Sequence, residues 1–296
     1  MDLTAYLESR RLLVEKALQR WVPGEKEFPA PVHEAMRYSL FAGGKRLRPI
    51  LLLAATEAAG GKSSDALPLA CSLELIHTYS LIHDDLPAMD DDDLRRGKPT
   101  SHKVFGEALA ILAGDALLTE AFHLMARPDL MRRLSPDRRL QAIHMVAREA
   151  STLGLIGGQA MDILSQGKKV EPSLVEYIHS HKTGALIAAA VGAGAIVGGA
   201  EARAYRALTG YGRKLGLAFQ VVDDLLDLEG QERNLGKTVG KDRAKGKITY
   251  PRIFGVPASR RKAEELVAGA LAHLASFSRK ADPLRAIARF VLERES

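Results

Sequence analysis

Residues 184–200 carry no charged side chain over 17 consecutive positions, and this stretch limits how the chain folds. It is shorter than the roughly 20 apolar residues that a membrane-spanning helix needs. Glycine, which lets two backbones approach closely, occurs in it at Gly184, Gly192, Gly194, Gly198 and Gly199. We therefore expect a buried helix packed closely against its neighbours, and no membrane span.

Helical patterns dominate the remainder of the 296 residues. Aromatic residues make up only 5% of the chain, whereas Ala and Leu, which favour helices, are abundant. Strand-like alternation between turn signals is scarce. Helices are expected at about 2–20, 31–42, 46–60, 64–85, 106–126, 136–152, 154–166, 172–198, 201–228 and 258–274. The sequence thus predicts an all-α, single-domain helical bundle over residues 1–296.

Six aspartates lie within ten residues directly after one apolar helix pattern. They are Asp84, Asp85 and residues 90–93. Two such charges ~5 Å apart repel by roughly 3 kcal/mol at an effective dielectric near 20. Most charge runs are solvated loops, but residues 73–83 are largely apolar and Pro87 breaks the helix just beyond Asp85. Basic side chains follow immediately at Arg95, Arg96 and Lys98. We therefore expect this cluster to hold cations, in an irregular segment over residues 86–100.

A second acidic cluster lies in the last turns of the helix expected over 201–228. Gln220, Asp223, Asp224 and Asp227 have the spacing i, i+3, i+4 and i+7, so they share one helix face. Three carboxylates on one stripe oppose helix formation unless a cation lies over them. Carboxylate oxygens suit Mg²⁺, which is often shared between one or two carboxylates and substrate phosphates. Two such clusters predict a diphosphate gripped from both sides.

Several basic residues stand where they could bind phosphate. Lys45 and Arg48 follow Gly43-Gly44, where the backbone can turn toward a ligand. His77 lies two helical turns before Asp84, so a binding role is as well supported as a place in the core. Lys182-Thr183 opens the uncharged helix, although ordinary helix-start chemistry also explains this pair. A second irregular segment, expected at residues 229–246, carries Lys237 and Lys241, and Lys247 follows it.

The overall charge and the single cysteine exclude some classes of protein. The net charge is +6, but no run of five basic residues and no interleaved aromatics point to nucleic acid. Cys71 is the only cysteine, so no disulfide forms within the chain and a reducing cytoplasm is expected. Charges are mixed throughout residues 1–21, which does not match a signal peptide.

Together these motifs resemble the trans-isoprenyl diphosphate synthases, and among them the bacterial farnesyl diphosphate synthases. The matching segments occur in family order between about residues 34 and 251. They are residues 43–49, 83–97, 158–159, 182–184 and 220–227. The resemblance implies an all-α isoprenoid-synthase fold around a central apolar cavity, a homodimer, and small isoprenoid diphosphates as substrates. It also implies three Mg²⁺ ions per active site.

The resemblance assigns roles residue by residue. It implies that Asp84, Asp90 and Asp223 ligate Mg²⁺. The isopentenyl diphosphate site would contain Lys45, Arg48, His77 and Arg96. The allylic diphosphate site would contain Arg95, Lys182 and Lys237, with the oxygens of Thr183 and Gln220 beside the carbocation. Supporting positions would be Asp85, Asp224, Asp227, Gln159 and Lys247. Tyr79 and Ser80, one turn before Asp84, would form the floor of the chain-length pocket.

The reaction expected by this resemblance joins isopentenyl diphosphate to dimethylallyl and then geranyl diphosphate, giving the C15 farnesyl product. Geranyl or geranylgeranyl diphosphate synthesis remains an alternative within the family. A terpene cyclase would not need the second diphosphate site of Lys45, Arg48 and Arg96. His83-Asp84 could indicate an HD-type phosphohydrolase, but the other histidines lack such Asp-paired motifs. A non-catalytic subunit would typically have lost aspartates that this chain retains.

Overall fold

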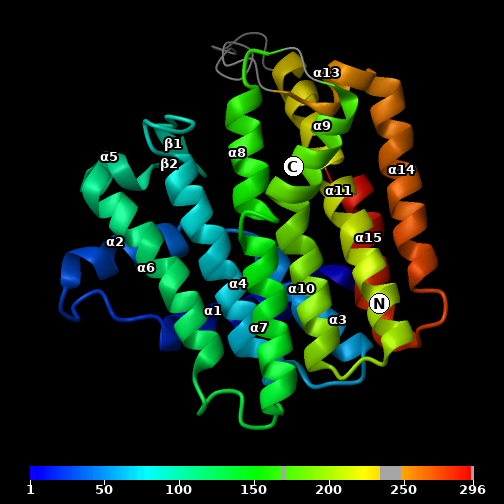
Figure 1. The fold of residues 1–296 in the computed structure, drawn as a ribbon, viewed down its shortest axis with the longest axis horizontal. Helices are drawn as coiled ribbons and strands as arrows, with labels where there is room; N and C mark the ends of the chain where they lie inside the picture. The colour runs from blue at the N-terminus through cyan, green and yellow to red at the C-terminus, as the bar shows by residue number, and fades with distance from the viewer. Residues whose placement is uncertain (169–170, 234–247, 295–296) are drawn as a thin grey trace.

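The computed structural model describes residues 1–168, 171–233 and 248–294. It is a bundle of long helices, with shorter ones at the two ends of the bundle (Figure 1). The first half contains α1 Leu3–Trp21, α2 Ala30–Leu40, α3 Leu47–Ala58, α4 Ser63–Asp84, α5 Ser101–Phe105, α6 Glu107–Ala126 and α7 Pro136–Ala150. The second half contains α8 Leu155–Ser165, α9 Pro172–Ile178, α10 Gly184–Val197, α11 Ala202–Arg233, α13 Tyr250–Phe254, α14 Val256–His273 and α15 Asp282–Glu293. The predicted all-α class is confirmed.

Helix α10 is the apolar centre of the bundle, as its uncharged sequence predicts. It packs against α3, α7 and α11, and nearly all of its residues are buried. A Cβ atom on Gly194 would lie 2.4 Å from the carbonyl oxygen of Leu52, so only glycine allows this approach of α3. Thr56 of α3 bonds across the contact, donating its hydroxyl to the Gly194 carbonyl at 3.2 Å.

The helix predicted over 172–198 contains a change of winding. A π-helical turn, η1 His179–Thr183, separates α9 from α10. Such turns often occur at functional sites, because the extra residue turns side chains out of the regular helical register. Here the turn carries both Lys182 and Thr183. By length and composition alone, the segment Pro172–Val197 and helix α6 could each cross a membrane, but the first is mostly buried inside the bundle.

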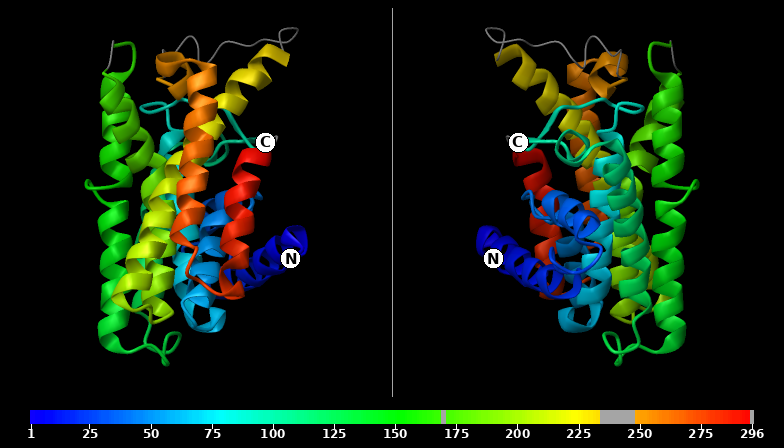
Figure 2. Two further views of the ribbon diagram at one scale, coloured as in Figure 1. Left: turned by 90° about the vertical axis from the view of Figure 1, so that its right-hand side faces the viewer. Right: turned by 90° about the vertical axis from the view of Figure 1, so that its left-hand side faces the viewer.

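Two other departures from the expected elements concern the loops and the C-terminal part. The acidic loop after α4 contains a small antiparallel hairpin, β1 Leu94–Arg95 with β2 Lys98–Pro99. Helix α11 continues to Arg233, past the predicted end near residue 228. Helices α5, α13 and α15, and the 3₁₀ turn η2 Arg279–Ala281, were not expected. The carboxyl ends of α4 and α11 lie at the same end of the bundle, at the top of Figure 1 and Figure 2.

Candidate active site

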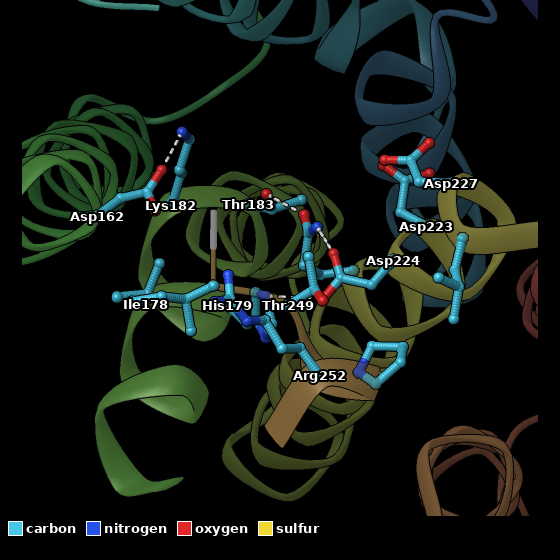
Figure 3. Close-up of a pocket in the computed structure, with 14 residues that line it drawn as sticks. Asp162, Ile178, His179, Lys182, Thr183, Asp223, Asp224, Asp227, Thr249 and Arg252 are labelled. Carbon is cyan, nitrogen blue, oxygen red and sulfur yellow. Dashed lines mark hydrogen bonds and ion pairs between the residues drawn. The ribbon is translucent and has the colours of Figure 1, made fainter. Parts of the chain in front are cut away.

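A cavity of about 570 Å³ opens between η1 and α11 at this end of the bundle (Figure 3). It combines carboxylates, cations and apolar side chains. Its lining consists of Asp162, Ile178, His179, Lys182, Thr183, Gln220, Asp223, Asp224, Asp227, Leu228, Ile248, Thr249, Pro251 and Arg252. The sequence-predicted residues of the second acidic cluster and of the Lys-Thr pair therefore meet in one place.

The Thr183 hydroxyl and the Gln220 amide form one hydrogen-bonded unit. Thr183 Oγ1 donates to Gln220 Oε1 at 2.6 Å, although the two residues are 37 positions apart. Gln220 Nε2 in turn donates to Asp224 Oδ1 at 2.8 Å. Figure 3 draws both bonds on the cavity wall. The Thr183 and Gln220 oxygens, which we expect beside the reacting carbon, are thus bonded to each other, and the Asp224 carboxylate orients the Gln220 amide.

Lys182 is positioned by helix α8. Its Nζ lies 2.6 Å from Oδ2 of Asp162, whose carboxylate is buried. The backbones of α8 and the π turn also lie close together. A Cβ atom on residue 158 would lie only 2.1 Å from the amide nitrogen of Lys182. The π turn therefore rests directly on α8, and glycine at 158 is what lets the two backbones meet.

The first acidic cluster lies within electrostatic reach of the cavity. Burial raises the pKa of Asp84 from its ordinary value near 3.8 to about 6, with Lys182 opposing the rise and Asp90 adding to it. Asp90 is tied to the helix end through its amide, which donates to the Asp84 carbonyl at 2.8 Å. Asp85 faces away into an ion pair with Arg95, at 2.5 Å. Asp84 and Asp90 therefore share a site with Lys182, whereas Asp85 holds the hairpin.

Asp223 has a partner from the far end of the chain. Arg294 Nη2 lies 2.9 Å from Asp223 Oδ1, while 46% of the Asp223 side chain stays exposed. The guanidinium of Arg294 itself is almost fully buried, and burial lowers its pKa. Arg294 thus holds Oδ1 of Asp223 in place, while the side chain remains accessible from the cavity.

A second group of cations gathers around the start of α3 and the middle of α4. Burial, and then the charges of Arg48 and Arg96, lower the pKa of His77 well below its ordinary value near 6.5. Arg48 also feels the charge of Asp223, and its buried Nε has no hydrogen-bond partner among the described residues. Arg96 bonds to the Gly43 carbonyl with a backbone φ of 53°. Three sequence-predicted residues are therefore brought together.

The loop that carries these cations is anchored by a buried ion pair. Arg46, with a φ of 52°, places Nη1 2.7 Å from Oε1 of Glu74 and donates through Nη2 to the Leu40 carbonyl at 2.7 Å. A left-handed conformation at an arginine is strained, and such strain gathers at functional sites. Lys45 lies beside Arg46 on the exposed part of this loop.

The remaining predicted residues are placed less decisively. Tyr79 is buried with its ring edge against His83, and Ser80 donates its hydroxyl to the His77 carbonyl at 2.9 Å. Gln159 has both of its amide atoms buried, without a hydrogen-bond partner in the described part of the chain. Lys237 and Lys247 lie outside the described residues.

Sequence reasoning missed Asp162, His179 and Arg294. Asp162 and His179 stand in helical segments and Arg294 near the chain end, where nothing in the local pattern marks them as partners of Lys182, Asp224 and Asp223. The sequence contained one indication for Asp162. It lies three residues after Gln159, so the two side chains share a helix face with the Gly158-Gln159 motif. The Arg294 contact joins segments too far apart for any spacing argument.

The donor set fits hard divalent cations that a substrate also ligates. Within the described residues, no three or more His, Cys, Asp or Glu side chains are grouped closely enough to hold a metal ion by themselves. Mg²⁺ commonly uses one or two carboxylates and completes its shell with water and phosphate oxygens. The few carboxylates at Asp84, Asp90 and Asp223, of which Asp223 lines the cavity, match that requirement.

The all-α bundle, with carboxylate and cation groups near the ends of α4 and α11, has the architecture of the helical isoprenoid synthases. The polyprenyl synthetase family model matches residues 29–281, and this chain belongs to that family. It is 49% identical over 274 residues to farnesyl diphosphate synthase of Geobacillus stearothermophilus, covering 93% of this chain and 92% of that protein.

Relatives named for other products are comparably similar. Geranylgeranyl diphosphate synthase of Cyanophora paradoxa is 47% identical over 296 residues, with 100% of this chain and 97% of the relative covered. A crystal structure of an FPP/GFPP synthase from Zymomonas mobilis superposes with a TM-score of 0.88 at 36% identity, covering 98% of this chain and 99% of that one.

Proposed function

We propose that this chain is a Mg²⁺-dependent farnesyl diphosphate synthase. It would condense isopentenyl diphosphate head-to-tail with dimethylallyl and then geranyl diphosphate, and the whole chain would act as one catalytic domain. The observation that carries the proposal is the pair of carboxylate sets at the ends of α4 and α11. Lys182 lies near the first set, and Arg48 lies within reach of the charge of Asp223.

Asp84, Asp90 and Asp223 are the proposed metal ligands, for three Mg²⁺ ions shared with the allylic diphosphate. Bound Mg²⁺ would neutralise the charge that develops on the departing diphosphate. Asp84 supports this role because its pKa is raised mainly by burial and also by the nearby charge of Asp90, and a bound cation would stabilise the ionised carboxylate. The allylic diphosphate subsite would be completed by Arg95, Lys182 and Lys237. Asp227 and Lys247 would support it.

Lys45, Arg48, His77 and Arg96 are the proposed isopentenyl diphosphate subsite. Burial keeps His77 neutral, so it would act as a hydrogen-bond donor while the arginines supply charge. Arg48 has a planar fork that fits two phosphate oxygens, and its buried, unpartnered Nε is available for that use. Separate cation groups for two diphosphates distinguish a condensing enzyme from a cyclase.

The chain's own residues would then perform three tasks. Lys182 and the arginines orient the allylic diphosphate and stabilise its developing charge. The Thr183 and Gln220 oxygens face the electron-poor carbon that remains after ionisation. The apolar walls exclude water, so the alkene of isopentenyl diphosphate is the nucleophile that reaches the cation. A proton is then lost to the released diphosphate.

The proposed product length is C15: the large, buried Tyr79 and the small Ser80, one turn before Asp84, would form a pocket floor that stops growth after two added units. A C20 product is the second candidate, and the similarity to the Cyanophora paradoxa geranylgeranyl diphosphate synthase supports it. Production of C10 would require a shallower pocket.

The proposed assembly is a cytoplasmic homodimer. Helices α6, α7 and α8 lie on one side of the bundle (Figure 2). They expose large apolar side chains at Ile111, Leu112, Leu140, Ile156 and Leu164, and Leu112 is 53% exposed. A second copy of the chain would cover these exposed apolar side chains.

One assay tests the proposed function. The protein is incubated with Mg²⁺, isopentenyl diphosphate and, in turn, the C5, C10 or C15 allylic diphosphate, and the products are sized. We expect C15 from the C5 and C10 primers, with little extension of C15. Efficient C15-to-C20 extension would favour the geranylgeranyl alternative, and no condensation with any primer would reject prenyl transfer.

A further inference from the structure

Asp224 differs from the two other aspartates on its helix face. In Figure 3, Asp223 and Asp227 lie side by side and apart from Thr183, whereas the Asp224 carboxylate points toward Thr183 and His179. The Asp224 side chain is only 7% exposed, against 46% for Asp223. The spacing in the sequence makes the three aspartates look equivalent, but their surroundings in the structure differ.

The oxygens of Asp224 are already occupied by donors from three segments. Oδ1 accepts from Gln220 Nε2 at 2.8 Å. Oδ2 accepts from the backbone amide of Tyr250 at 2.7 Å, and Nε2 of His179 lies 3.1 Å from the same oxygen. His179 stacks on the Tyr250 ring, at 5.9 Å between centroids, so its position is fixed as well.

This arrangement determines how the Gln220 amide is oriented. A carboxylate only accepts hydrogen bonds, so Gln220 must present its NH₂ group to Asp224 and its oxygen to Thr183. Thr183 must then donate its only hydroxyl proton to Gln220 Oε1. The Thr183 oxygen is left with acceptor lone pairs for the cavity, which suits a carbocation and does not suit a diphosphate oxygen.

We propose that Asp224 is a positioning residue that does not bind metal: with His179 and the Tyr250 amide, it locks Gln220 so that Thr183 offers an acceptor-only oxygen to the reacting carbon. This inference rests on the proposed prenyl transfer. It assigns His179, which no motif marked, to the same task. It also divides the second acidic cluster into a metal-facing carboxylate at Asp223 and an orienting carboxylate at Asp224.

Asp224→Asn is the sharpest variant because it keeps the shape of the side chain. Tyr250 and His179 both donate, so they would hold the new amide oxygen and turn its NH₂ toward Gln220. The Gln220 amide would then flip, and Thr183 would point its proton into the cavity. We expect kcat to fall roughly 10- to 100-fold, while both KM values stay within about threefold and Mg²⁺ binding is unchanged.

The matched comparison is Asp223→Asn, and Mg²⁺ binding is measured apart from turnover by calorimetric titration in the presence of inorganic diphosphate. We expect Asp223→Asn to weaken Mg²⁺ binding and Asp224→Asn to leave it as in the wild type. Equal weakening by both variants would make Asp224 a metal ligand and overturn the proposal. This titration decides the point even if the wild type makes no prenyl product, a result that would reject only the proposed function.

A rescue variant tests the orientation itself. In Asp224→Asn combined with Gln220→Glu, one glutamate oxygen accepts from the new amide and the other from Thr183, so the Thr183 proton returns to its original direction. We expect the double variant to recover at least tenfold in kcat over Asp224→Asn. No recovery in a double variant with wild-type melting behaviour would overturn the proposal. If Asp224→Asn does not fold, His179→Phe, which keeps the ring stack, should lower kcat with unchanged Mg²⁺ binding, and unchanged kcat would count against it.

Discussion

Arg294 is fastened to Asp223, which lies 71 positions earlier in the chain, with 2.9 Å between Nη2 and Oδ1. The same nitrogen donates to the Phe219 carbonyl at 2.8 Å, and the guanidinium lies 3.9 Å from the centre of the Phe219 ring. The end of the chain after α15 thus places a buried cation on a carboxylate that we propose as a metal ligand.

Removing that cation is expected to strengthen Mg²⁺ binding. In Arg294→Met the apolar contact with Phe219 is kept, but the charge that competes with Mg²⁺ for Asp223 is lost. The Mg²⁺ concentration that gives half-maximal turnover should fall several-fold, at a stability cost of about 1–3 kcal/mol from the lost charged hydrogen bond to the Phe219 carbonyl. Arg289→Met, at an exposed position of α15, is the control. An unchanged Mg²⁺ dependence would show that the pair has no effect on the metal site.

Asp84→Asn should stabilise the metal-free protein at neutral pH. The folded-state pKa of Asp84, about 6, lies above its ordinary value near 3.8, so the ionised carboxylate costs folding free energy. That cost is present above pH 6 and disappears as the pH falls through 6 toward 4. The variant should therefore gain up to about 3 kcal/mol at pH 7.5 and almost nothing at pH 4.

The measurement is thermal or urea unfolding in EDTA at both pH values. Asp93→Asn, at an exposed aspartate of the same cluster, is the control and should change stability little at either pH. An equal gain in unfolding free energy for Asp84→Asn at pH 7.5 and pH 4 would contradict the conclusion that burial raises the pKa of Asp84.

Arg48→Ala and Lys182→Ala should separate the two diphosphate subsites. Arg48 lies with His77 and Arg96, whereas Lys182 acts on Asp84. Arg48→Ala should raise the KM for isopentenyl diphosphate at least tenfold with a smaller effect on the allylic substrate. Lys182→Ala should lower kcat or raise the allylic KM. Steady-state kinetics with each substrate varied in turn checks this, and equal weakening of both substrates by both variants would reject two separate sites.

Product length should respond to the residues one turn below Asp84. Ser80→Phe fills the upper pocket and should shift the product toward C10, while Tyr79→Ala opens the floor and should allow C20. Overfilling a packed site costs ~1–3 kcal/mol, so unfolding is measured alongside product size. A folded Ser80→Phe enzyme that still stops at C15 would remove Ser80 from the pocket.

The sequence was sufficient for the class of fold and for most of the long helices, whereas α5, α13 and α15 were not predicted. Periodicity and the uncharged run at 184–200 predict a buried helix, and α10 is that helix. The π turn at His179–Thr183 escaped prediction because its residues have ordinary helix propensities, and the turn depends on tertiary contact with Gly158. Helix α15 was missed although the sequence carried a signal for it, because Leu284, Ile287, Ala288 and Val291 recur at helical spacing.

At the site, spacing identified residue types but not their partners. The i, i+3, i+4, i+7 pattern placed Gln220 and the three aspartates on one face, yet Asp224 turns toward His179 and Tyr250 because donors from other segments hold it there. Likewise Asp85 belongs to the same acidic run as Asp84 but pairs with Arg95. Such divisions depend on long-range packing, which a local pattern does not contain.

Metal dependence of the two acidic clusters is the centre of this account. The most direct measurement is turnover of isopentenyl and geranyl diphosphates by the wild type, Asp84→Ala and Asp223→Ala, each with Mg²⁺ and with EDTA. The account predicts that either substitution lowers kcat by ~100-fold or more with the circular dichroism spectrum unchanged, and that EDTA abolishes wild-type turnover. Near-normal turnover by the wild type in EDTA, or by either variant in Mg²⁺, would contradict it.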